Sequence, residues 1–145
     1  MKPARFAAAM VLLALACSVI ADPDMSAPDA AAAVTEGKVV LVDIRTPPEW
    51  KETGVAKGAR LLNMLHHQGG PGFTKALLDM VGGDRNAPVA LICRTGARTT
   101  QVQRYLQSQG FTKVYNVKEG MVGSSAGPGW LKHGLPVETC ATLQC

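Results

Sequence analysis

One cysteine, Cys93, lies between an apolar run and a group of small and basic residues that reads as the start of a helix. The residues that follow it are Arg94, Thr95, Gly96, Ala97 and Arg98. Backbone N–H groups in the first turn of a helix have no intrahelical partner, so they can converge on an anion. The two arginines add positive charge, and the glycine permits the backbone angles of a tight turn. We therefore expect the Cys93 thiol to ionise more readily than a free cysteine and to act as a nucleophile.

The alternative for Cys93 is a half-buried cysteine at a strand end that packs as a small hydrophobe. The spacing narrows the chemistry if the residue does react. Four residues separate Cys93 from Arg98, one fewer than in the loops of protein phosphatases. The loss of one residue shortens such a loop by up to ~3.5 Å of chain. The loop should therefore hold a single terminal sulfur better than a tetrahedral phosphate.

The elements around Cys93 alternate between apolar runs and helical patterns, with turn residues between them. This alternation predicts an α/β fold with a mainly parallel sheet, whose reactive crevice lies beyond the carboxyl ends of the strands. Cys93 follows one predicted strand, and Asp43 and Arg45 lie at the end of another. We expect strands at 39–42, 60–65, 89–92 and 113–117, helices at 26–36, 73–81 and 98–109, a short helix from Pro47, a loop at 66–72, a glycine-rich loop at 120–129 and a helical turn at 130–133.

Three stretches, taken in order, resemble the signatures of single-domain rhodaneses. They are LVDIRTPPEW at 41–50 with 54–63, CRTGAR at 93–98, and Gly120-Met121 with Trp130 and GLPV at 134–137. The resemblance covers about residues 26–140 and implies a three-layer α/β sandwich with a central, mainly parallel sheet of about five strands flanked by helices. Two features depart from the family pattern: Val55 stands where a histidine is common, and residues 123–129 lengthen the segment before Trp130.

The resemblance also implies a sulfurtransferase mechanism. The Cys93 thiolate would take a sulfane sulfur from thiosulfate or a persulfide, hold it as a persulfide, and pass it to a thiol or cyanide acceptor; a protein thiol is a further candidate acceptor. Amides of Arg94, Thr95, Gly96, Ala97 and Arg98 would bind the sulfur, and the two arginines would attract an anionic donor. Asp43 and Arg45 would support the loop, with a purely structural ion pair as the alternative. No metal or organic cofactor is implied.

The first 21 residues have the pattern of a secretory signal peptide. Lys2 and Arg5 precede an uncharged, mostly apolar run at 6–20, and Ala21 offers a small residue for cleavage. Cleavage there predicts a periplasmic or secreted protein with no membrane span in the mature chain. The alternatives are an uncleaved anchor and a lipoprotein attached through Cys17, both of which we favour less. The predicted organisation is a signal peptide at 1–21, a rhodanese-like domain at 22–140 and a cysteine-containing tail at 141–145.

Three cysteines would remain after cleavage, so at least one is free or bonds outside the chain. Cys140 and Cys145 could close a small disulfide ring, which would leave Cys93 as the free thiol. Such a pair could be a structural bridge, which we favour, a redox pair that resolves a persulfide on Cys93, or a link to another protein. A zinc site is not expected, because the cysteines and histidines lack ligand spacing.

Charge and composition exclude a nucleic-acid-binding protein. The formal net charge is +4, but two of the basic residues belong to the signal segment, and aromatic residues make up 5% of the chain. Two alternatives to an exported sulfurtransferase stay open. One is a non-catalytic rhodanese-like module, which binds a partner or senses sulfur or redox state through Cys93. The other is a thiol-disulfide protein that acts through its tail.

Overall fold

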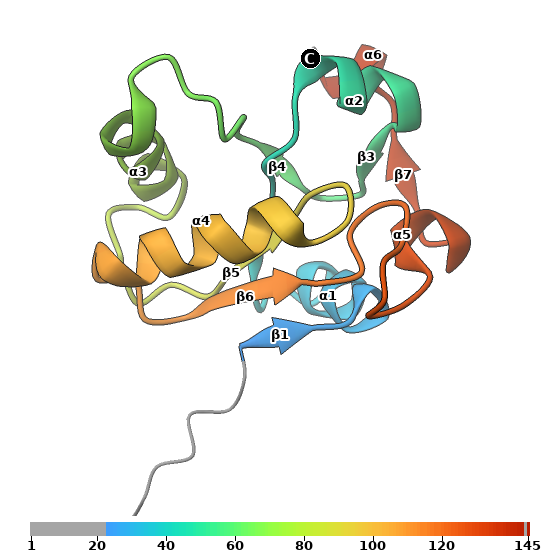
Figure 1. The fold of residues 1–145 in the computed structure, drawn as a ribbon, viewed down its shortest axis with the longest axis horizontal. Helices are drawn as coiled ribbons and strands as arrows, with labels where there is room; N and C mark the ends of the chain where they lie inside the picture. Colours follow the sequence, from blue (N-terminus) through green and yellow to red (C-terminus); the bar gives the residue numbers. More distant parts are fainter. Residues whose placement is uncertain (1–22, 144) are drawn as a thin grey trace, which may run out of the picture.

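The computed structural model describes residues 23–143 and 145. The predicted signal peptide at 1–21 and Cys17 lie outside these residues. A five-stranded sheet forms the centre, and every pairing within it is parallel. Its strands, in spatial order, are β1 (Asp24–Met25), β6 (Val114–Val117), β5 (Val89–Ile92), β2 (Val40–Asp43) and β4 (Arg60–Leu61). The predicted α/β fold with a parallel, five-stranded sheet and flanking helices is confirmed (Figure 1).

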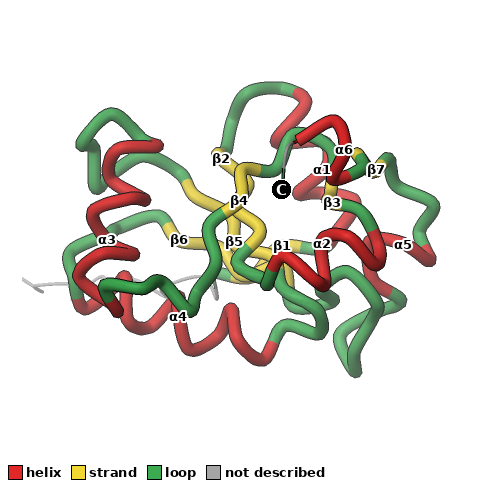
Figure 2. The backbone as a smooth tube through the Cα atoms, turned by 90° about the horizontal axis from the view of Figure 1, so that it is seen from above, coloured by secondary structure: helices red, strands yellow, loops and turns green. Residues whose placement is uncertain are grey.

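Helices cover both faces of the sheet (Figure 2). They are α1 (Ala27–Thr35), α2 (Pro47–Thr53), α3 (Gly69–Met80), α4 (Ala97–Ser108), α5 (Gly129–Lys132) and α6 (Cys140–Leu143). Alternate residues of a strand point to opposite faces. Ala90 and Ile92 of β5 accordingly pack into the core under α1, α2 and α5, while Val89, Leu91 and Cys93 pack into the core under α3 and α4. Cys93 thus belongs to the α3–α4 face.

Helix starts follow the capping signals of the sequence. Ser26 precedes α1, and its side chain accepts a hydrogen bond from the Asp29 N–H at 3.2 Å, as an N-cap serine should. At α2, the Glu49 carboxylate accepts from both the N–H and the hydroxyl of Thr46, at 3.1 and 2.9 Å. These bonds fix where each helix begins, and the second also fixes the position of the Glu49 side chain near the carboxyl ends of the strands.

Some expected boundaries are wrong. Helix α3 begins at Gly69, inside the segment 66–72 that we expected to be a loop, because Pro71 lies in the first turn, where a missing N–H breaks no intrahelical bond. The strand expected at 60–65 pairs regularly only at Arg60–Leu61, although the N–H groups of Leu62 and Met64 still bond to β2 and the residue after it.

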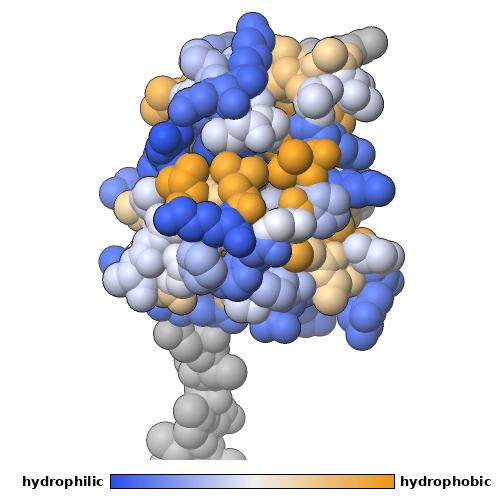
Figure 3. Space-filling model, turned by 90° about the vertical axis from the view of Figure 1, so that its right-hand side faces the viewer, coloured by the Kyte–Doolittle hydropathy of each residue, from blue (hydrophilic) through white to orange (hydrophobic). Residues whose placement is uncertain are grey.

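A second sheet was not expected. It pairs β3 (Val55–Ala56) with β7 (Val137–Glu138) in antiparallel fashion. After β7 the chain forms α6, and Cys140 at its start is joined by a disulfide to Cys145, with their Cα atoms 5.0 Å apart. Figure 3 views the end of the molecule that carries α5 and β7 and shows apolar side chains grouped across it; Val137 of β7 is 42% exposed. No helix within residues 23–143 is long and apolar enough to cross a membrane.

Candidate active site

Cys93 follows β5 directly and lies at the carboxyl edge of the sheet. Its side chain is 1% exposed and is the free thiol among the described cysteines. Asp43 pairs with Ile92 across β2 and β5, so the ends of both strands meet beside the sulfur, as the sequence predicts. The loop after Cys93 leads within four residues into α4, the long helix at the front of Figure 1.

The sulfur of Cys93 receives a backbone hydrogen bond at the start of α4. The N–H of Gly96 donates to Sγ at 3.1 Å, and Gly96 is the N-cap of the helix, with φ +88°. A Cβ at this position would lie 2.2 Å from the carbonyl oxygen of Lys118, so only glycine fits. The N–H and the positive end of the helix dipole both stabilise negative charge on the sulfur.

A hydroxyl that sequence reasoning missed also contacts the sulfur. Thr99 Oγ1 lies 3.5 Å from Cys93 Sγ and 2.9 Å from the carbonyl oxygen of Gly96, and the Thr99 side chain is fully buried. Its single O–H can donate to either acceptor. Thr99 comes directly after Arg98 and lies in the first turn of α4, so its place in the helix was a signal that it faces the loop.

A second loop, residues 120–122 and called the bracing loop below, is hydrogen-bonded to the cysteine loop, residues 93–98. The N–H groups of Met121 and Val122 donate to the carbonyl oxygens of Cys93 and Arg94, at 2.9 and 3.1 Å. Gly120, with φ +64°, allows this contact because a Cβ there would lie 2.3 Å from the Arg94 carbonyl oxygen. These bonds turn both carbonyls away from the sulfur, so the loop can present an N–H to it.

Glu119 holds the bracing loop in place, and sequence reasoning missed it as well. Its carboxylate, 5% exposed, accepts from the N–H groups of Ala27 and Gly129 at 2.9 and 3.0 Å and lies 2.7 Å from His133 Nε2. Burial alone would raise the pKa of Glu119, but these hydrogen-bond partners together hold it below its ordinary value. The carboxylate thus ties α1 to the lengthened segment before Trp130.

The two arginines of the loop pair with α2. Both Glu49 oxygens accept from Arg98, at 2.9 and 2.5 Å, and Arg94 lies 3.3 Å from Glu52. The Arg98 hydrogen bonds are the main cause that lowers the pKa of Glu49 to about 2. The pKa of Arg98 is raised, chiefly by Glu49, with smaller contributions from Cys93 and Asp43. In the sequence, Glu49 stands out only as part of the first rhodanese-like signature, and nothing local indicates its pairing with Arg98.

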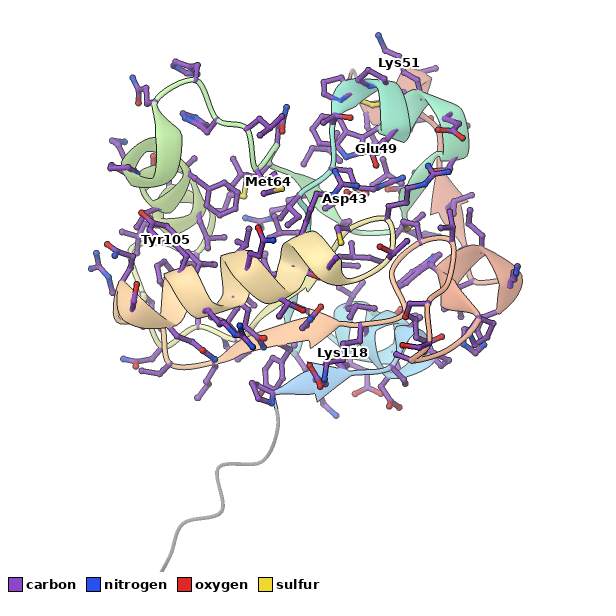
Figure 4. All side chains as sticks on the ribbon, viewed as in Figure 1. Asp43, Glu49, Lys51, Met64, Tyr105 and Lys118 are labelled. Atoms are coloured by element: carbon purple, nitrogen blue, oxygen red, sulfur yellow. A yellow bond between two sulfur atoms is a disulfide. The ribbon has the colours of Figure 1, made fainter. Side chains whose placement is uncertain are left out.

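Asp43 and Arg45 form a fully buried ion pair. Arg45 donates to both carboxylate oxygens of Asp43, with the closest contact at 2.7 Å, and neither side chain is exposed. Its remaining donors reach Thr53 Oγ1 at 2.8 Å and the carbonyl oxygens of Glu49 and Gly54 at 3.3 and 2.9 Å. The pair therefore anchors α2 to the end of β2, and Figure 4 shows Asp43 below Glu49 near the start of α4.

The remaining predicted residues lie in two places. Thr95 and Ala97, in the loop after Cys93, are exposed. Among residues 23–143 and 145, the amide that donates to Sγ is that of Gly96. Cys140 and Cys145 lie in the tail after β7 and pack against the core under α1, α2 and α5, the face of the sheet opposite to Cys93. Within the described part of the chain, no three His, Cys, Asp or Glu side chains are grouped to hold a metal ion.

Two sequence comparisons find similar proteins. The family model described as the rhodanese-like domain matches residues 26–126. A protein of Allochromatium vinosum named sulfurtransferase is 34% identical over 99 residues, 68% of this chain and 78% of that protein. The chain thus has the sequence of a rhodanese-like domain with a sulfurtransferase relative at modest identity, which supports sulfur transfer in general.

Two solved structures share the fold and more than a quarter of the aligned residues. The M. tuberculosis protein Rv0390 superposes with a TM-score of 0.62 at 27% identity and covers 79% of this chain and 96% of its own. The polysulfide-sulfur transferase homodimer of Wolinella succinogenes gives a TM-score of 0.55 at 28% identity and covers 79% and 77%.

Proposed function

Because the chain belongs to the rhodanese-like domain family, we propose that it is an exported sulfurtransferase that carries a sulfane sulfur on Cys93. The observation that carries the proposal is the Gly96 N–H at 3.1 Å from Sγ, at the N-terminus of α4, with the Thr99 hydroxyl at 3.5 Å. The Gly96 N–H stabilises a thiolate, and afterwards the charge on a bound persulfide, and the Thr99 hydroxyl adds a second hydrogen bond when its O–H turns from the Gly96 carbonyl oxygen to the sulfur.

The reaction has two half-steps. The Cys93 thiolate attacks the outer sulfur of thiosulfate, a new S–S bond forms, and sulfite leaves with the electron pair of the broken bond. A thiolate or cyanide then attacks the outer sulfur of the Cys93 persulfide and returns the electron pair to Sγ. The acceptor leaves as a persulfide or as thiocyanate, and the free thiolate is restored. A persulfide donor reacts in the same way with a thiolate as leaving group.

The surrounding residues have supporting roles in this proposal. Arg94 and Arg98 border the sulfur with their charges offset by Glu52 and Glu49, so they attract an anionic donor less strongly than free arginines would. Asp43 and Arg45 hold α2, and through it the two glutamates, beside the loop. The proposed location is the periplasm or the exterior, after removal of residues 1–21.

One observation favours a non-catalytic module as the second candidate: the Cys93 side chain is only 1% exposed. A binding or sulfur-sensing role needs no turnover, whereas a sulfurtransferase must expose the sulfur to a donor. The disulfide tail is a third candidate site of thiol chemistry.

Steady-state transfer from thiosulfate to cyanide separates these candidates. The comparison uses the wild-type protein, Cys93→Ser and the double variant Cys140→Ser/Cys145→Ser. We expect parallel double-reciprocal lines, typical of ping-pong kinetics, for the wild type and for the double variant, and no turnover for Cys93→Ser. Turnover by Cys93→Ser would refute the proposal, and loss of turnover only in the double variant would assign the chemistry to the tail.

A further inference from the structure

A cavity of about 200 Å³ lies between α3 and α4, on the face of the sheet that carries Cys93. Its lining residues are Met64, Gly70, Phe73, Gln101, Val102 and Tyr105. Most of the lining is apolar, and Gln101 and Tyr105 are the lining residues whose side chains carry nitrogen or oxygen atoms. A larger cavity of about 320 Å³ adjoins α1 and Trp130, on the other face, so it does not adjoin the sulfur.

Helix α4 connects the cavity to the sulfur. Residues three and four positions apart lie on one side of a helix. In α4 this spacing joins Arg98, Gln101, Val102 and Tyr105. Val102 is three residues beyond Thr99, which contacts Sγ, and therefore about 4.5 Å farther along the helix axis. Val102, which lines the cavity, thus lies about one helical turn beyond the residue that contacts the sulfur.

Met64 forms the facing wall. Its N–H donates to the Ile44 carbonyl oxygen at 3.0 Å, and the Ile44 N–H donates to the carbonyl oxygen of Ile92, the residue before Cys93, also at 3.0 Å. Figure 4 shows Met64 above α4, between α3 and the end of β2, with Tyr105 farther along the helix. Both walls therefore begin at the edge of the sheet where Cys93 lies.

The far end of the cavity is fixed. The Tyr105 hydroxyl lies 3.3 Å from Thr74 Oγ1, and a Cβ at Gly70 would lie 2.6 Å from that hydroxyl. Tyr105 therefore packs against the first turn of α3, where a side chain at position 70 would displace it. An enclosed apolar cavity of about 150 Å³ is large enough to bind benzene, so this pocket of about 200 Å³, which is open to solvent on one side, has room for a phenyl ring or a short branched alkyl group.

We propose that this cavity binds the carbon group of a small apolar thiol, which accepts the sulfur from Cys93; the inference rests on the proposed function. The thiol sulfur would face the persulfide while its aryl or alkyl group packs against Met64, Phe73 and Val102. The offset of both loop arginines by glutamates fits this assignment, since a neutral carbon group needs no charge for its recognition. Transfer converts the thiolate to the organic persulfide and returns the electron pair to Cys93.

The kinetic test follows the second half-step on protein that already carries the persulfide. Phenylmethanethiol should react with a kcat/KM at least tenfold above that of 2-mercaptoethanol, because only the former fills the cavity. Met64→Gln should lower this preference about fivefold relative to the wild type. The matched control is Leu65→Gln, since Leu65 is the next residue, is 71% exposed and does not line the cavity; its preference should equal that of the wild type.

A binding test works even if the protein forms no persulfide. Benzyl methyl sulfide, which has no thiol, should shift the methyl NMR signals of Val102 in the wild type and in Leu65→Gln, and bind at least fivefold more weakly to Met64→Gln. Absence of binding would overturn the inference. So would an equal preference for phenylmethanethiol in Met64→Gln and Leu65→Gln, or sulfur transfer to a cysteine-containing peptide without transfer to phenylmethanethiol. If binding occurs without any persulfide on Cys93, the cavity stands and the proposed function fails.

Discussion

Both oxygens of Glu49 accept hydrogen bonds from Arg98, at 2.9 and 2.5 Å, and join α2 to the first turn of α4 across 49 residues of sequence. The same carboxylate caps α2 through Thr46. One side chain therefore sets the position of α2 and offsets the charge of Arg98, the second arginine of the cysteine loop. The loop is held by a pair whose strength depends on the ionisation of Glu49.

This pair predicts a specific dependence of stability on pH. The folded pKa of Glu49 is about 2, below the ordinary value of 4.5, so its contribution to the free energy of unfolding is complete above pH 4.5 and is lost as the pH falls through 2. Urea denaturation between pH 2 and pH 6 should show this contribution, on the order of 2 kcal/mol, in the wild type and not in Glu49→Gln. Parallel pH profiles for the two proteins would contradict the assignment.

The buried pair of Asp43 and Arg45 predicts a large loss of stability on removal of the acid. Asp43→Asn leaves the Arg45 guanidinium buried without its counter-ion, which should lower the free energy of unfolding by about 3–5 kcal/mol. The matched control is Asp79→Asn, which breaks the exposed pair with Lys75 and should leave the free energy of unfolding almost unchanged, because water screens that pair. Chemical denaturation would measure both variants. A similar loss in the free energy of unfolding for the two would show that the buried pair stabilises the fold no more than the exposed pair does.

A side chain at Gly96 should destabilise the protein by more than backbone strain alone. Both Gly96 and Gly37 have a positive φ, of +88° and +67°, but a Cβ at Gly37 meets nothing within 4 Å, whereas one at Gly96 meets the Lys118 carbonyl at 2.2 Å. Gly37→Ala should cost about 1 kcal/mol, and Gly96→Ala should cost at least about 2 kcal/mol more and abolish sulfur transfer. Equal melting temperatures for the two variants, with activity kept, would contradict the tight packing of the loop.

Removal of the Thr99 hydroxyl should slow persulfide formation on Cys93 and leave the fold intact. Thr99→Val keeps the shape of the side chain and removes the hydroxyl at 3.5 Å from Sγ, so persulfide formation should slow about tenfold, the effect of losing one hydrogen bond to a charged group. Thr99→Ser restores the hydroxyl and should recover most of the rate. Stopped-flow measurement of sulfite release would follow this step, and equal rates for Val and Ser would exclude a role for the hydroxyl.

The strand, the turn and the helix that position Cys93 could be predicted from local sequence. An apolar run ends at Ile92, a glycine stands three residues after the cysteine, and helical periodicity follows, so each signal lies within a few residues of the next. The partners of Arg98 and of the bracing loop could not be predicted in this way. Glu49 and Glu119 act on groups 49 and 92 residues away, and only the folded chain brings them together.

The short elements were missed for a different reason. Strands β1, β3 and β7 have two residues each, too few to show an alternating pattern, and they form only because neighbouring segments offer free backbone groups. The pairing of β1 with β6 is an example: Asn116 N–H donates to the Pro23 carbonyl at 2.8 Å, and the Gln103 side chain donates to the same oxygen at 3.0 Å.

The most direct test of the account is the intact mass of the protein after incubation with thiosulfate, measured for the wild type and for Cys93→Ser. The wild type should gain one sulfur atom, ~32 Da, that is lost on addition of cyanide or a reductant, while Cys93→Ser should gain nothing. A wild type that never gains this mass with thiosulfate or with a persulfide donor, or a Cys93→Ser variant that gains it equally, would contradict the central claim that Cys93 carries the transferred sulfur.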